Sequence, residues 1–197
     1  MLIHPWDAGT TEQSLAYLKD NAFGHLIAAG RGRDVPVVVP TQFLLRDERT
    51  IWLHLARPNP IWPAIEENPA VLLSVAGPWT YVPGKWRAEG GSDPSLGVPT
   101  TYYSSVQVVC HAELVDDADE KLEILRAQLD DQEPGHGDPA RMPRLLAGLR
   151  GLRLSVTEIR GKFKYDGHKD ADHRERVAEG LAARRGPGDE AALRHLA

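Results

Sequence analysis

The chain has 197 residues, of which 42% are hydrophobic and 26% are charged, and its formal net charge is -5. This length predicts one globular domain, and no run approaches the roughly 18 apolar residues that a membrane span needs. The acidic balance does not support direct DNA binding, for which a basic face is expected. Because the N-terminus lacks a basic stretch followed by an apolar run, we expect a cytoplasmic protein.

The first third of the chain predicts a helix followed by an antiparallel meander. Thr10 or Thr11 is a suitable cap for a helix over residues 12–21. Alternating or apolar runs bounded by turn residues then predict strands at 24–29, 35–41 and 50–55. A short helix at 60–67 follows, with Pro60 in its first turn.

The middle of the chain predicts long strands separated by one long loop. A strand at 70–76 continues through 79–82, and another covers 101–114. Between them, residues 83–100 are rich in glycine and proline, and we expect a functional or mobile loop that acts as a lid. Helices at 116–129 and 141–149 precede a strictly alternating strand at 152–159.

These elements predict a mainly β (α+β) fold, an antiparallel barrel of six or seven strands with peripheral helices. After residue 170 the composition becomes polar and helical, with an amphipathic helix at 172–185. We therefore divide the chain into a barrel domain over 1–170 and a C-terminal helical extension over 171–197. This extension is expected to pack on the barrel or on a partner subunit.

Few residue patterns offer chemistry of a recognisable kind. The dinucleotide, nucleoside triphosphate and hydrolase motifs are absent, and the eight histidines lack the spacing of a metal motif. We predict no metal site, and no catalytic residue can be assigned. The single cysteine, Cys110, follows the apolar run 106–109, so we expect a small core residue rather than a reactive thiol.

The segment 54–62 predicts an anion cradle, because a buried strand runs directly into Arg57 and Asn59. A guanidinium offers a planar fork of donors that suits a phosphate, and the Asn59 amide adds a further donor. The alternative is an ordinary polar loop in which Arg57 pairs with Glu66 or Glu67 of the following helix. His54, in phase with Trp52, is either a core residue with a polar partner or a cofactor contact.

Two further patterns are compatible with a flat anionic ligand. Lys162 and Lys164 flank Phe163, so on an extended segment both ammonium groups point to one face, toward a polyanion or the edge of a flavin ring. Five aromatic residues also gather near Arg57 in the sequence, either to stack on a conjugated ligand or to form a core and a dimer interface. These five are Trp52, Trp62, Trp79, Tyr81 and Trp86.

Several segments, in chain order, resemble the PaiB-type family of FMN-binding negative transcriptional regulators. The most specific are H-L-A-R-P-N-P-I-W at 54–62 and E-I-R-G-K-F-K at 158–164; weaker matches lie at 21–24, 40–41, 77–82 and 98–100. The resemblance implies a flavin reductase-like split β-barrel and a homodimer with one FMN at each subunit interface. It places Arg57 and Asn59 at the phosphate, and Lys162 and Lys164 toward the isoalloxazine or ribityl chain. The other cofactor-site residues in the matching segments are His54, Trp62 and Thr100.

Departures from the family pattern leave the function open. Thr101, Tyr102 and Gln107 stand where the family has tryptophan, asparagine and histidine, and residues 84–96 resemble an insertion. The chain is thus expected to be a flavin-binding regulator, or a flavin-dependent oxidoreductase if it is an enzyme. The alternative is a cofactor-poor regulatory protein that acts through a protein partner. Haem or a deazaflavin is the alternative cofactor, with His168 or His173 of the C-terminal tail as an axial haem ligand.

Overall fold

The computed structural model describes residues 1–90, 92–135, 137–141 and 143–196. The chain folds into two compact units, each built from segments that are distant in the sequence. Unit 1 comprises Met1–Thr10, Ala76–Ser105 and Gly161–Ala197, and unit 2 comprises Thr11–Val75 and Val106–Arg160.

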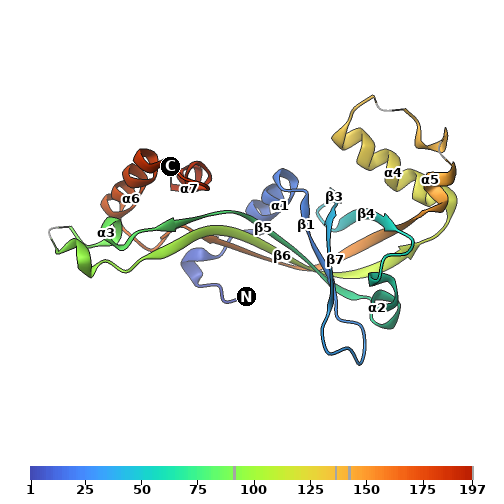
Figure 1. Cartoon of the computed structure of the whole chain (residues 1–197), viewed down its shortest axis with the longest axis horizontal. Helices are drawn as coiled ribbons and strands as arrows, with labels where there is room; N and C mark the ends of the chain where they lie inside the picture. Colours follow the sequence, from blue (N-terminus) through green and yellow to red (C-terminus); the bar gives the residue numbers. More distant parts are fainter. Residues whose placement is uncertain (91, 136, 142, 197) are drawn as a thin grey trace. The chain divides into compact units, whose positions relative to one another are not determined.

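Seven strands of the described chain form one sheet, in the order β2-β1-β5-β6-β7-β4-β3 (Figure 1). The strand pairs β1–β2, β1–β5, β3–β4 and β4–β7 are antiparallel. The long strands β5 (Ala70–Val82), β6 (Thr100–Val115) and β7 (Leu149–Lys164) contribute residues to both units. The shorter strands are β1 (Phe23–Ala28), β2 (Val37–Gln42), β3 (Leu44–Asp47) and β4 (Thr50–Ala56).

The predicted meander is wrong in one respect. The strand β3 was not expected, because its four residues are half-buried or exposed and do not alternate. It pairs with β4, which on its other side pairs with β7 through contacts such as Leu53 opposite Leu152. In the predicted meander β4 would pair with the β1–β2 hairpin, but in the sheet it lies between β7 and β3. The local sequence pattern does not specify which strands pair.

In unit 2, helices pack against the strands and bury apolar side chains of the sheet. Its core includes Leu26, Leu53, Ile61, Ile124 and Leu152, all completely buried. The Asp117 carboxylate caps the helix that begins at Ala118 by accepting hydrogen bonds from the backbone N–H groups of Asp119 and Glu120. The helices are α1 (Thr11–Asp20), α2 (Ile61–Glu67), α4 (Ala118–Gln132) and α5 (Pro143–Ala147), and η3 (Pro139–Arg141) is a 3-10 turn.

Unit 1 contains short helices where a long loop was expected. The segment 83–100 holds α3 (Gly84–Arg87) and η2 (Pro94–Leu96), and its Gly91 lies outside the described residues. Gly84 and Gly97 approach so closely that a Cβ on Gly84 would lie 2.1 Å from the Gly97 carbonyl oxygen. Glycine therefore lets the two ends of the segment meet.

The C-terminal part of unit 1 is helical, as its polar composition predicted. The Asp170 carboxylate accepts a hydrogen bond from the His173 N–H at 2.7 Å, which caps α6 (Ala171–Arg184). A second helix, α7 (Asp189–Leu196), follows, and η1 (Pro5–Asp7) lies in the N-terminal segment. The proposed domain boundary at residue 170 stays a prediction. None of the described helices has the length and apolar character needed to cross a membrane.

Candidate functional site

Lys162 and Lys164 extend from the same face of β7, as the alternation of an extended segment predicts. Their ammonium nitrogens lie 5.6 and 5.9 Å from the centroid of the Tyr103 ring. Phe163 instead contacts His195, with ring centroids 5.9 Å apart. Tyr103 thus joins the two lysines in one cluster, although no role was predicted for this residue.

Hydrogen bonds fix both ammonium groups of this cluster. Lys164 Nζ donates to Thr100 Oγ1 at 2.7 Å, and Lys162 Nζ donates to the Leu2 carbonyl oxygen at 2.8 Å. Three of the predicted cofactor residues, Thr100, Lys162 and Lys164, therefore meet in unit 1. With Tyr103 they form a group that we call the lysine cluster.

Arg57 lies in unit 2 and already has an acidic neighbour. Its Nη2 donates to Asp116 Oδ1 at 3.2 Å, and its Nε donates to the Ala147 carbonyl oxygen at 3.2 Å. Hydrogen bonds from Arg150 foremost, together with Arg57, hold the pKa of Asp116 below its usual range. About half of the Arg57 side chain remains exposed.

The alternative partners expected for Arg57 are bound elsewhere. Glu66 pairs with Arg150 at 2.7 Å, and Glu67 pairs with Arg33 at 2.6 Å. The kind of partner was predicted correctly, since Arg57 does pair with a carboxylate. The identity was wrong, because Asp116 follows β6 in sequence and only the folded chain brings it near.

Three other predicted site residues of unit 2 make contacts within that unit. Asn59 Oδ1 accepts a hydrogen bond from the Ile61 N–H at 3.1 Å, at the start of α2. Trp62 is only 4% exposed and donates through Nε1 to the Ala56 carbonyl oxygen at 3.0 Å. His54 Nδ1 lies 2.7 Å from Gln128 Oε1, which is the polar partner that its alternating position predicted.

The five aromatic residues divide between the units rather than forming one ligand platform. Trp52 and Trp62 are buried in unit 2. Trp79 and Tyr81 belong to unit 1 and are 64% and 50% exposed. The burial of Trp52 and Trp62 agrees with the core part of the predicted alternative, and its dimer interface stays a prediction.

One departure from the family pattern is part of a buried polar cluster in unit 1. Tyr102 is completely buried and its hydroxyl donates to Asp166 Oδ2 at 2.9 Å. Burial, with the nearby Asp166 charge, raises the pKa of Tyr102. Tyr102 therefore has a structural role in the described chain.

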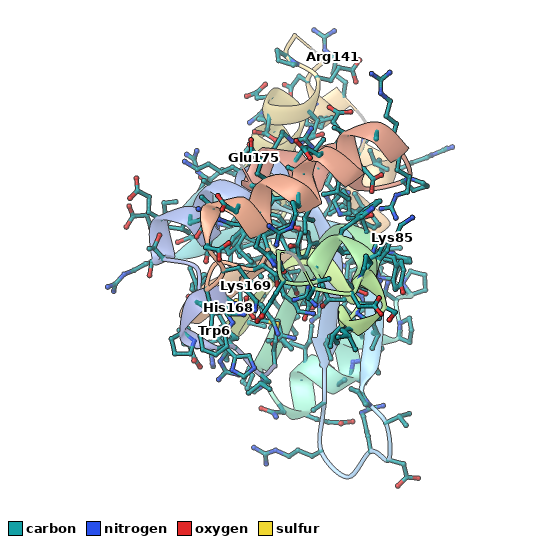
Figure 2. All side chains as sticks on the ribbon, turned by 90° about the vertical axis from the view of Figure 1, so that its left-hand side faces the viewer. Trp6, Lys85, Arg141, His168, Lys169 and Glu175 are labelled. Atoms are coloured by element: carbon teal, nitrogen blue, oxygen red, sulfur yellow. The ribbon has the colours of Figure 1, made fainter. Side chains whose placement is uncertain are left out.

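The two histidines considered as haem ligands have other surroundings. His173 is not an exposed tail residue, since it is 5% exposed and its Nε2 lies 3.0 Å from Asp166 Oδ2. The His168 ring lies beside Trp6, with ring centroids 4.9 Å apart (Figure 2). In the portion of the chain that the structure describes, no group of three or more side chains is arranged to hold a metal ion.

The donor set of the lysine cluster fits the polar parts of a flavin nucleotide. Two ammonium groups and the Thr100 hydroxyl offer hydrogen bonds to a phosphate or to the oxygen-rich edge of the ring system. The Tyr103 ring provides an aromatic surface beside these donors. The side chains of unit 1 are thus chemically suited to an anionic, conjugated ligand.

Comparisons with known proteins identify a family described as FMN-binding, with a match that ends before Lys162 and Lys164. The sequence profile of a family described as "Putative FMN-binding domain" matches residues 2–158. The protease synthase and sporulation protein PAI 2 of Bacillus subtilis (strain 168) is 24% identical over 185 residues, covering 89% of this chain and 86% of that protein.

Solved structures support the fold. The flavocytochrome Anf3 from Azotobacter vinelandii matches with a TM-score of 0.62 and 22% identity, over 81% of this chain and 70% of that chain. The FAD and haem binding protein from Mycobacterium smegmatis matches with a TM-score of 0.60 and 20% identity, over 87% of this chain and 78% of that chain. The predicted α+β split-barrel class is thereby confirmed.

Proposed function

We propose that this chain, which belongs to the FMN-binding domain family, is a flavin-binding regulatory protein that works as a homodimer. FMN, the cofactor expected from the sequence, is the one for which the family is named. Bound FMN would supply the redox chemistry, while the protein binds and orients it. The observation that carries the proposal is the lysine cluster, where Lys162 and Lys164 contact the Tyr103 ring and Lys164 donates to Thr100.

Within unit 1, these side chains would hold the polar groups of the cofactor in a fixed orientation. The hydrogen bond from Lys164 to Thr100 restricts the lysine side chain, and the N-terminal segment restricts Lys162 through Leu2. Because less side-chain freedom is lost on binding, such preorganised donors bind a ligand more tightly. The phosphate contacts of Arg57 and Asn59 stay a prediction from the family resemblance.

Exposed apolar side chains of unit 1 support the homodimer. Trp79, Tyr81, Leu96 and Val98 are between 50% and 73% exposed. Large aromatic and apolar residues are enriched at protein interfaces, and an exposed apolar surface of this kind favours association. A Trp79→Ser variant is expected to shift the molar mass measured by light scattering toward that of a monomer. An unchanged molar mass would remove Trp79 from the proposed interface.

The net charge of -5 supports regulation through a protein partner rather than through direct contact with DNA. Promoter DNA should therefore migrate unchanged with the purified protein at physiological salt. An oxidoreductase is the second candidate, and it is distinguished by reduction of the bound FMN with NADH or NADPH. Inertness toward both would leave the regulatory role.

The first test of the proposal is visible absorption after FMN is added and excess is removed by gel filtration. Flavin bands should be retained by the wild type and by Lys169→Gln, which changes an exposed lysine of the same unit. Loss of the bands in Lys164→Gln is the expected result. A wild-type protein that retains no flavin under these conditions would refute the proposed function.

A further inference from the structure

Lys162 is a nearly buried positive charge that has no acidic partner. It is 7% exposed, and its ammonium group donates to one carbonyl oxygen, that of Leu2. Across the described residues, no carboxylate oxygen forms an ion pair with Lys162 or with its neighbour Lys164. A buried charge without a counter-charge is costly, and bound anions commonly remove that cost.

A second buried lysine of the described chain, Lys121, also lacks an acidic partner, but it uses more of its donors. Lys121, which is 6% exposed, donates to two carbonyl oxygens, those of Leu146 and Leu149. Arg57, the residue expected at the phosphate, lies half-exposed beside Asp116. The charge of Arg57 is therefore already partly compensated, whereas the two positive charges of the lysine cluster are not.

The geometry of the lysine cluster leaves hydrogen-bond donors available. An ammonium group has three N–H donors, and in each lysine one of them is used, at Leu2 or at Thr100. The centroid of the Tyr103 ring lies 5.6 and 5.9 Å from the two nitrogens, so both charges contact the same aromatic side chain. Two neighbouring ammonium groups with spare donors suit a group that carries several oxygens and more than one negative charge.

The N-terminal segment covers this site. Ala8 pairs with Lys162 as an isolated antiparallel bridge, and the Gly9 N–H donates to the Gly161 carbonyl oxygen at 3.1 Å. The Leu2 carbonyl oxygen of the same segment accepts from Lys162, whose residue is only 7% exposed to water. Because electrostatic attraction grows as water is excluded, an oxyanion is bound more strongly there than on an open surface.

We propose that Lys162, Lys164 and Tyr103 form a phosphate-binding subsite, so that the cluster holds the phosphate of FMN rather than its ring. The assignment of FMN as the source rests on the proposed function, but the phosphate chemistry does not. The same chemistry would bind a free phosphate or another phosphate monoester. Arg57 then serves only as an ion-pair partner of Asp116, which also pairs with Arg150 in unit 2.

The test compares FMN with riboflavin, which lacks the phosphate, and with inorganic phosphate, each titrated into the full chain. Lys164→Gln and the double variant Lys162→Gln/Lys164→Gln are expected to lower the affinity for FMN and for phosphate by about tenfold to 100-fold, the range for charge-assisted hydrogen bonds. Riboflavin affinity should change by less than about twofold. Lys169→Gln is the control, because it removes the same charge elsewhere in unit 1. Arg57→Gln tests the other candidate for the phosphate contact.

Tyr103 provides a second, independent readout. Tyr103→Phe keeps the ring, so phosphate affinity should stay within about twofold, whereas Tyr103→Leu should lower it by about threefold through loss of the cation-π contacts. Thermal unfolding of every variant shows which of them remain folded. If the double variant does not fold, Lys164→Gln and the Tyr103 pair decide the question, since their side chains are only partly buried.

The remaining outcomes separate the subsite from the proposed function. An equal loss of FMN and riboflavin affinity in the lysine variants would place the ring there and overturn the proposal. A loss of FMN affinity in Arg57→Gln alone would overturn it as well. If the wild type binds neither flavin, lysine-dependent binding of inorganic phosphate still supports the subsite, and its absence refutes it.

Discussion

The carboxylate of Asp166 accepts both arms of the Arg87 guanidinium, from Nε at 2.9 Å and from Nη2 at 3.0 Å. The Arg87 and Asp166 side chains are only 13% and 4% exposed. Arg87 also donates through Nη1 to the Val98 carbonyl oxygen. Arg87 therefore links the two ends of the segment 84–98 to Asp166, which lies two residues after the end of β7 in unit 1.

Removing this carboxylate should destabilise the protein strongly. We expect Asp166→Asn to lower the free energy of unfolding by about 3 kcal/mol, because it leaves the Arg87 charge buried and uncompensated. The measurement is urea denaturation at pH 7. Glu158→Gln is the control, since the Glu158–Arg160 pair is exposed and should contribute less than about 1 kcal/mol. Equal effects of the two variants would contradict the prediction.

Asp189 should make unfolding sensitive to acid. Hydrogen bonds, above all from Arg184, lower the pKa of this buried carboxyl to about 2. Its pKa in the unfolded chain is about 3.9, so the stabilisation is complete above about pH 4 and is lost as the pH falls toward 2. Asp189→Asn should therefore cost about 2 kcal/mol at pH 6 and almost nothing near pH 2. Denaturation curves for both proteins across this range check the prediction, and a constant difference would refute it.

Gly180 lies within α6, where alanine normally stabilises a helix by about 1 kcal/mol. Here we expect Gly180→Ala to destabilise the protein instead, because a Cβ would lie 2.5 Å from ring atoms of Trp86. Thermal unfolding measures the sign. In a Trp86→Leu background the same substitution should become neutral or stabilising, and a stabilising effect in the wild-type background would show that the ring moves aside at little cost.

Cys110 should be unreactive in the folded protein. It is 2% exposed, and burial raises the pKa of its thiol to about 12. Ellman's reagent at pH 8 is expected to modify it only after addition of denaturant. Rapid modification of the native protein would show that β6 opens locally, whereas a rate that follows global unfolding would support a core position.

The sequence by itself determined those features that depend on local periodicity. The period-two alternation of an extended chain placed Lys162 and Lys164 on one face and Phe163 on the other, wherever the strand came to lie. The apolar run before Cys110 likewise predicted its burial. Thr100 was identified by the family resemblance of residues 98–100, and the structure places its Oγ1 2.7 Å from Lys164 Nζ.

Tertiary structure alone decided the partners that are far apart in sequence. Asp116 rather than Glu66 or Glu67 accepts from Arg57, and Tyr103 rather than a predicted residue lies beneath the two lysines. The pairing of β4 with β7 joins residues more than 90 positions apart, such as Ala56 opposite Leu149. Such contacts depend on which strands become neighbours, and hydrophobic burial selects them over the whole chain. Local patterns specify which face a side chain occupies, but they carry no information on what lies across from it.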